Sequence, residues 1–142
     1  GVESSHNPVP ADDPAGVKFA YERSALPIAA DGSCVTASDI PAIADRCDIA
    51  NLKLMKTGGL LEAKRAVATA RSHGLEVMLG CMIESNASIA AGAHLGPLLD
   101  YADLDGSLLL AEDPYEGVDV TGGPLRLGDA DRAGTGARPL DE

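Results

Sequence analysis

A lysine and three aspartates stand where a folded chain could use them for chemistry. Lys53 lies inside the apolar run 49–55, where a charged side chain is costly unless it has partners or faces a polar cavity. Asp103 and Asp105 end another apolar run, and their spacing of two places both carboxylates on one face of a strand. Asp31 directly follows a third run. Carboxylates bind cations and a lysine can exchange a proton, so these four are candidate site residues.

Each of these positions also has a purely structural interpretation. Asp31-Gly32 is a common turn pair, Lys53 could be solvated, and the segment 103–106 could form an acidic turn. Glu84 could merely cap the helix that it opens. The residue types alone leave both interpretations open, so the elements that carry these residues decide between them.

Four short apolar runs recur along the chain, at 26–30, 49–55, 75–82 and 101–104, and their middles are 24 to 27 residues apart. Helical patterns separate them at 36–45, 59–73 and 84–95. The clearest pattern, 59–73, ends at Gly74 and places apolar residues three or four positions apart. Strands that alternate with helices predict an α/β fold of βα units with parallel strands, covered by helices on their faces.

Two architectures fit these units, an open doubly wound sheet or part of a (β/α)8 TIM-type barrel. A complete barrel needs about 250 residues. Four units would make roughly half of one, with two open sheet edges. In both architectures the polar residues that follow the strands would meet at one end of the sheet.

The two ends of the chain differ from this regular part. The first 12 residues are expected to be loop-like, and Asp13 and Pro14 predict the start of a helix. Residues 112–142 are rich in Gly and Pro, which predicts an irregular tail with a short hairpin formed by 118–120 and 125–127. The predicted organisation is therefore a half-barrel over 1–111 and a tail over 112–142.

Composition narrows the class of function. The 142 residues carry 11 basic and 22 acidic side chains, a formal net charge of −11, which argues against a nucleic-acid or anionic-membrane surface. No apolar run is long enough for a membrane helix, and the polar start is unlike a signal peptide. The odd number of cysteines, without a CxxC pair, predicts reduced thiols in a cytoplasmic protein.

The order and spacing of several motifs resemble the enolase superfamily, and within it the dipeptide epimerases of the L-Ala-D/L-Glu type. The resemblance covers residues 6–138 and depends on these strings: NLKLMKTGG at 51–59, GCMIES at 80–85, DLDG at 103–106 and LLLAEDP at 108–114. PVPADD at 8–13 and LPIAADGS at 26–33 match the preceding units. The resemblance implies that this chain is the C-terminal half of the family's barrel domain.

The resemblance also implies roles for individual residues. Asp31 would be the strand-5 ligand of a Mg²⁺ ion, and Lys53 the strand-6 acid and base of a 1,1-proton transfer at the α-carbon of a dipeptide's second residue. Asp103 and Asp105 would bind the dipeptide's free ammonium group, and Cys81 and Ile83 would line the same pocket. The implied enzyme is an isomerase with Mg²⁺ as cofactor and a dipeptide as substrate.

The chain departs from the family pattern in its first strand and in its extent. His6, Asn7 and Pro8 stand where a metal-binding glutamate is expected, and Glu3 is the nearest replacement. The family's strands 1–3, the opposing lysine and the capping domain have no counterpart, so a separate N-terminal half or a homo-oligomer is an expected partner. Two alternatives remain: a non-catalytic truncated half-barrel, or a related cycloisomerase or o-succinylbenzoate synthase, whose substrates carry no ammonium for the aspartate pair.

Overall fold

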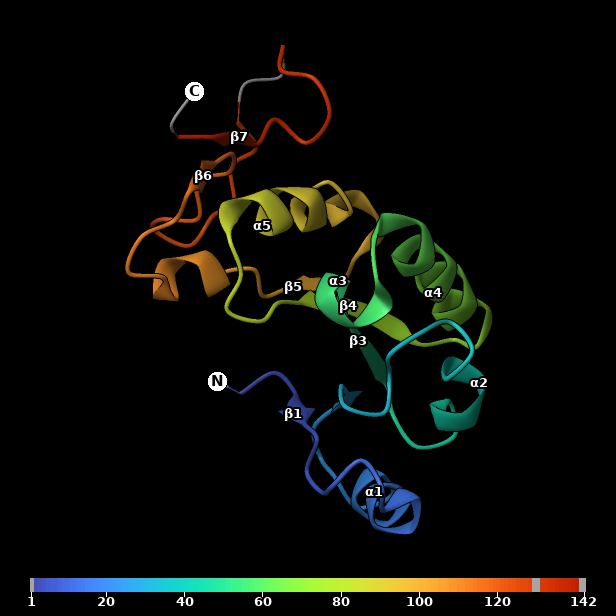
Figure 1. Ribbon diagram of the computed structural model, residues 1–142. Coiled ribbons are helices and arrows are strands. Elements are labelled where there is room, and N and C mark those ends of the chain that lie inside the picture. The colour runs from blue at the N-terminus through green and yellow to red at the C-terminus, as the bar shows by residue number, and fades with distance from the viewer. Residues whose placement is uncertain (1, 129–130, 141–142) are drawn as a thin grey trace.

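A computed structural model describes residues 2–128 and 131–140, and its centre is a curled sheet of five parallel strands in sequential order (Figure 1). The strands are β1 (Ser5–His6), β2 (Ile28–Ala30), β3 (Ile49–Lys53), β4 (Glu76–Gly80) and β5 (Tyr101–Ala102). The helices are α1 (Pro14–Tyr21), α2 (Ile40–Ile43), α3 (Leu54–Thr57), α4 (Leu60–Ser72) and α5 (Asn86–Ala93), with short 3-10 turns η1 (Gly96–Leu98) and η2 (Gly106–Leu109). A sheet of sequential parallel strands lined by helices is half of a barrel, which confirms the predicted fold class.

The four predicted strands are β2 to β5, but the prediction for the first 12 residues was wrong in part. Ser5 and His6 form β1, because the amides of Ser5 and Asn7 donate to the carbonyls of Pro27 and Ala29 at 2.9 and 3.2 Å. Such a two-residue strand has no local signal, since its stabilising bonds come from β2.

The helix expected over 36–45 was also too long, since only α2 is helical there. The Asp39 carboxylate accepts from the amides of Val35 and Thr36, which holds the preceding segment in a turn. Pro41 then occupies the first turn of α2, where its missing N–H costs nothing. The predicted start at Asp13 is confirmed, with its side chain accepting from Gly16 N at 2.9 Å.

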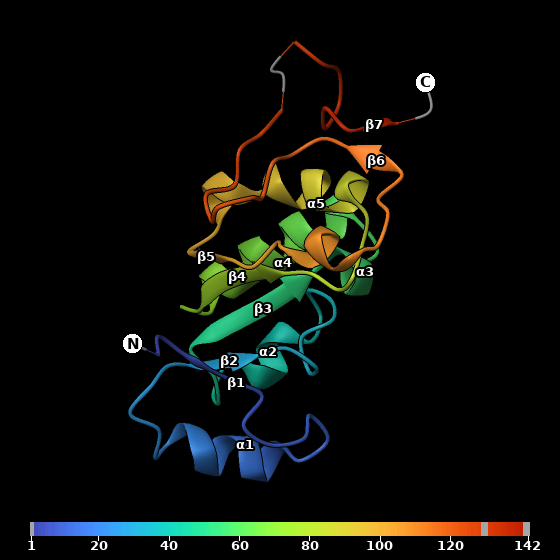
Figure 2. The ribbon, with the colours of Figure 1, turned by 90° about the vertical axis from the view of Figure 1, so that its left-hand side faces the viewer.

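The two faces of the sheet carry different residues, as the period of two requires. The outer face packs against the helices through a large core that includes Ile28, Leu52 and Leu79. The inner face has only a small cluster of Ala29, Ile49, Met78 and Tyr101. Figure 2 shows the strands stacked between α1 and α5, with the tail beyond α5. Polar residues, among them Asp31 and Lys53, lie at the carboxyl ends of the strands, further along the strands than this inner cluster.

The tail after residue 111 packs on α5. The Asn86 side chain accepts from Val118 N at 2.7 Å and donates to Val118 O at 2.8 Å, and Val118 is part of the main core. The expected hairpin has one antiparallel bridge, Asp119 to Arg126, and β6 (Tyr115–Glu116) pairs with β7 (Arg138–Pro139). The boundary after residue 111 stays a prediction. No helix in the described part of the chain is long and apolar enough to cross a membrane.

Candidate functional site

Lys53 and Asp31 meet at the carboxyl ends of β3 and β2. The Lys53 Nζ lies 2.8 Å from Asp31 Oδ2, and the two side chains are only 16% and 18% exposed. Lys53 is the last residue of β3, and the alternation of the strand places it on the inner face with Ile49. The charge of Lys53 inside the apolar run 49–55 therefore has a partner in Asp31. Such a partner is expected, because burying an unpaired charge costs free energy.

A second lysine, to which the sequence analysis gave no role, holds the other side of the same carboxylate. Lys56 Nζ lies 2.5 Å from Asp31 Oδ1, and it also donates to the backbone carbonyls of Asp31 at 2.7 Å and Asn51 at 3.2 Å. Its side chain is 13% exposed. Lys56 follows Lys53 by three positions, about one turn of α3, which is the only signal in the sequence that the two are neighbours.

The two ammonium groups keep Asp31 ionised. Burial would raise the pKa of the Asp31 carboxyl, but the hydrogen bonds from Lys53 and Lys56 and the charges of both lysines together hold that pKa below its ordinary value. The backbone amide of Asp31 donates to Asn7 Oδ1 at 3.0 Å, which links this corner to β1. Asp31 is thus a fixed anion between two cations.

A glycine on the neighbouring strand makes room for the side chains of Lys53 and Asn51. A Cβ at Gly80, which pairs with Lys53 across β3 and β4, would lie 3.0 Å from Asn51 Oδ1 and 3.2 Å from Lys53 Cε. Asn51 is 2% exposed, and its Oδ1 is the one buried side-chain atom without a hydrogen-bond partner among the described residues. An unpaired acceptor and a lysine thus share the inner face beside Gly80.

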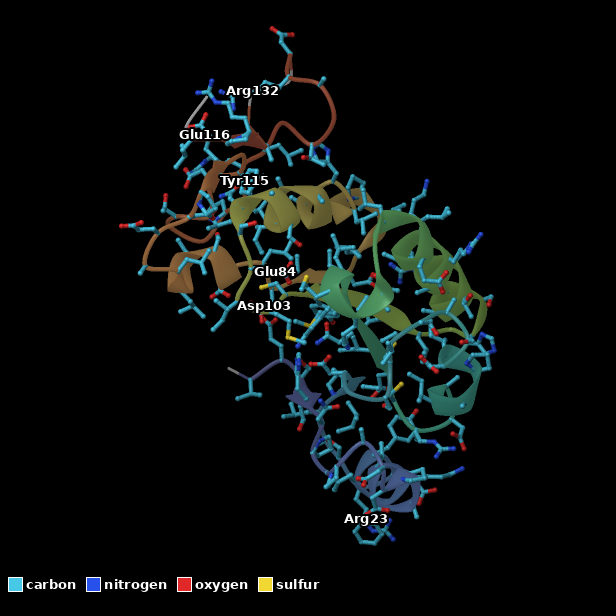
Figure 3. All side chains as sticks on the ribbon, viewed as in Figure 1. Arg23, Glu84, Asp103, Tyr115, Glu116 and Arg132 are labelled. Carbon is cyan, nitrogen blue, oxygen red and sulfur yellow. The ribbon has the colours of Figure 1, made fainter. Side chains whose placement is uncertain are left out.

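Asp103 and Asp105 form a second group beside the end of β4. Both line a cavity of about 370 Å³ between the end of β5 and the tail. The Gly106 amide donates to Cys81 Sγ at 3.3 Å, so the DLDG segment lies against the GCMIES segment. Figure 3 shows Asp103 and Glu84 on this flank of the sheet. The structure places Asp103, Asp105 and Cys81 near one another, as the strand order implies.

The loop after β4 presents apolar side chains. The Glu84 carboxylate accepts from Met82 N at 2.8 Å and from the Ser88 hydroxyl, which fixes the loop. Ile83 is 66% exposed as a result. Burial raises the pKa of the Cys81 thiol, opposed in part by the Gly106 amide, so this thiol is neutral and suited to lining a pocket.

The described residues do not build a magnesium site. Both oxygens of Asp31 are bound by lysines, and residues 2–128 and 131–140 contain no group of three or more His, Cys, Asp or Glu side chains that could hold a metal ion. Mg²⁺ prefers a nearly octahedral set of oxygen ligands, of which this corner offers one carboxylate. This chain alone therefore does not fit the metal that the family resemblance implies.

The half-barrel, with a lysine at the end of β3 and an aspartate pair after β5, defines the class of protein. Residues 3–142 match the model of the family "Enolase C-terminal domain-like", and the chain belongs to this family.

Individual relatives narrow the likeness. The chain is 45% identical over 123 residues to an L-Ala-D/L-amino acid epimerase of Flavobacterium johnsoniae, covering 87% of this chain and 37% of that protein. A dipeptide epimerase of Enterococcus faecalis V583, solved with Mg and the dipeptide L-Leu-L-Tyr, shares 35% identity and a TM-score of 0.87, covering 96% of this chain and 40% of the other. A dipeptide epimerase of Methylococcus capsulatus, solved with a Mg ion, shares 39% identity and a TM-score of 0.83, covering 96% and 41%. The chain thus spans well under half of the length of these relatives.

Proposed function

We propose that this chain is the C-terminal half of the barrel of a dipeptide epimerase of the L-Ala-D/L-Glu type. The observation that carries the proposal is Lys53, a lysine only 16% exposed on the inner face of a half-barrel, at the carboxyl end of its strand. Relatives named as epimerases of dipeptides support it, with identities of 36% to 49%. Because the chain covers about a third of their length, epimerisation belongs to a completed site, and this chain with its single base is expected to support only proton exchange on one face.

In this proposal Lys53 moves the proton. A neutral Lys53 Nζ takes the α-proton from the second residue of the dipeptide, and the electron pair of the C–H bond passes to the adjacent carbonyl oxygen. A group outside this chain returns a proton on the opposite face, which inverts the centre. Lys53 must first leave Asp31; its Cε already lies over Gly80, where the absence of a side chain makes room for it.

Asp103 and Asp105 orient the substrate in the same proposal. Their carboxylates line one cavity, and no lysine or arginine in the described part of the chain forms a salt bridge with either of them. An ammonium group would be attracted to this pair, and a blocked N-terminus would not. Cys81 and Ile83 would line the pocket beside the substrate, because the loop that holds them lies against the DLDG segment.

Mg²⁺ enters only for the completed protein. We propose that Asp31 contributes one oxygen ligand there, while the remaining ligands come from outside this chain. Isothermal titration calorimetry of the isolated chain with Mg²⁺ is expected to show no saturable binding, because both Asp31 oxygens are already bound by lysines. Saturable binding with released protons would contradict this reading of the site.

The decisive experiment is hydrogen exchange at the substrate. The chain is incubated with Mg²⁺ and L-Ala-L-Glu or L-Ala-D-Glu in D₂O, and the Glu α-proton is followed by NMR. A single base serves one face, so we expect exchange of one epimer only, abolished in Lys53→Met and unchanged in Lys64→Met, whose side chain is exposed. Equal exchange in Lys53→Met would contradict the proposal.

A non-catalytic half-barrel is the second candidate, and the lack of a metal-binding cluster in the described residues favours it. Absence of exchange for both epimers would support this candidate. A cycloisomerase or o-succinylbenzoate synthase is disfavoured by the aspartate pair, since such substrates have no ammonium group to bind.

A further inference from the structure

The strongest unassigned feature is the ammonium of Lys56. It is 13% exposed and has three oxygen acceptors: Asp31 Oδ1, the Asp31 carbonyl and the Asn51 carbonyl, at 2.5, 2.7 and 3.2 Å. A lysine ammonium has three hydrogens, so these contacts use all of its donors. Lys56 therefore has no donor left for a substrate. It can act only through the groups that it binds, which are Asp31 and the Asn51 carbonyl.

What Lys56 holds is the partner of Lys53. The Asp31 carboxylate is divided, with Oδ1 on Lys56 and Oδ2 on Lys53, the latter at 2.8 Å. The two backbone contacts of Lys56 fix it to the residue after β2 and to the middle of β3 at once. The direction of Oδ2 toward Lys53 is thus set by Lys56, a residue of α3, through its contact with Oδ1.

From this geometry we infer that Lys56 is a positioning residue for Lys53, acting through Asp31. Without Lys56, the Asp31 carboxylate is free to turn and to bind Lys53 with both oxygens. That pairing would draw Lys53 toward β2 and away from its present place over Gly80, where Lys53 Cε lies 3.2 Å from the position that a Cβ would take. Because Asp31 shares its charge between two lysines, it attracts each of them less strongly than it would attract a single lysine. Lys53 is therefore oriented by Asp31 but can still dissociate from it.

The inference rests on the proposed function, and its test compares three variants. Lys56→Met removes the charge and the donors at similar length, Lys56→Arg keeps both, and Lys64→Met is the matched surface control. Substrate α-proton exchange is measured as kcat and KM, and thermal unfolding is measured beside it.

Lys56→Met is expected to lower kcat on the order of 10²-fold with little change in KM, because misplacement of a reacting group acts on the chemical step. Lys56→Arg is expected to recover most of the loss, and Lys64→Met to lose nothing. Unchanged kcat in Lys56→Met, or an arginine variant no better than the methionine variant, would overturn the inference.

A crystal structure of Lys56→Met separates this inference from the proposed function. If the parent chain exchanges neither epimer, the proposed function fails while the positioning role can still be judged. An Asp31 carboxylate that has turned, with both oxygens on Lys53, supports the role of Lys56. An Asp31 side chain in its parent position rejects that role whatever the activity.

Discussion

Asp31 is the residue on which the charged corner depends, because its single carboxylate neutralises part of two buried ammonium groups. With Asp31 removed, Lys53 and Lys56 would keep their burial and lose their common anion. Removing one partner of a buried charge cluster is more costly than the cluster's own net contribution, since it leaves charges without compensation.

The pH dependence of stability should therefore report Asp31. Its folded pKa lies below the unfolded value of about 3.9, so its contribution is full above that value and is lost as the pH falls through the folded pKa. We expect Asp31→Asn to lower the free energy of unfolding by about 2 kcal/mol at neutral pH. The difference between the two proteins should begin to shrink below about pH 4 and vanish only once the pH has fallen through the folded pKa of Asp31.

Urea unfolding followed by circular dichroism over a pH series measures this difference. The exposed Asp12 provides the control, and Asp12→Asn should follow the parent at every pH. A stability difference between Asp31→Asn and the parent that does not change with pH would show that the lysine contacts do not stabilise the ionised form.

The sequence identified Lys53 and Asp31 as neighbours at one end of the sheet but not Lys56 beside them, and the reason is physical. A charge inside an apolar run is a local anomaly, visible without any tertiary information. Lys56 and Asp31 are 25 residues apart, and their contact exists only because β2 and β3 pair. The unpaired Oδ1 of Asn51 likewise depends on Gly80 of the next strand.

At the scale of elements, the close approach of η2 to the loop after β4 holds the aspartate pair beside the end of β4. A Cβ at Gly106 would lie 2.0 Å from the Met82 carbonyl oxygen and 3.0 Å from Cys81 Sγ. The glycine of DLDG is thus required by space. The motif was recognisable in the sequence, but this contact was not, because the partner backbone lies 24 residues away (106 − 82).

Gly106→Ala should therefore push the DLDG segment off Cys81. We expect a loss of stability of about 1–3 kcal/mol and a faster reaction of Cys81 with N-ethylmaleimide, since the other two cysteines are buried. Gly96→Ala is the control, because a Cβ at Gly96 meets nothing within 4 Å. Equal labelling rates and melting temperatures for the two variants would contradict the steric argument.

The contact of the tail with α5 gives a second element-scale prediction. Asn86→Ala removes both hydrogen bonds to Val118, at 2.7 and 2.8 Å, and leaves two backbone groups unpaired. Hydrogen exchange of the segment 115–127 should become faster, while β3 and β4 keep their protection as an internal control. Unchanged exchange in 115–127 would mean that Val118 is held by apolar packing alone.

At the scale of the whole molecule, the arrangement of the strands was predictable and the extent of the sheet was not. Periodic apolar runs gave β2 to β5, because each run is long enough to carry its own signal. The strand β1 and the true length of α2 were not predicted. β1 is stabilised by hydrogen bonds to β2, and the segment before α2 is held in a turn by hydrogen bonds to the Asp39 side chain. Among the described residues, the sheet ends at β1 and β5, each paired with one neighbouring strand.

Open edges make self-association the behaviour expected of the isolated chain. Ser5 and Asn7 donate to β2, so the N–H of His6 between them points away from the sheet and can donate to the carbonyl of another strand. His6→Pro removes this outward N–H without touching the bonds to β2. We expect the parent to associate as concentration rises, His6→Pro to associate less, and His6→Ala, which keeps the N–H, to follow the parent. Sedimentation velocity over a wide concentration range measures this. A parent that stays monomeric throughout would show that the edge is already protected, and equal association of all three would place the contact elsewhere.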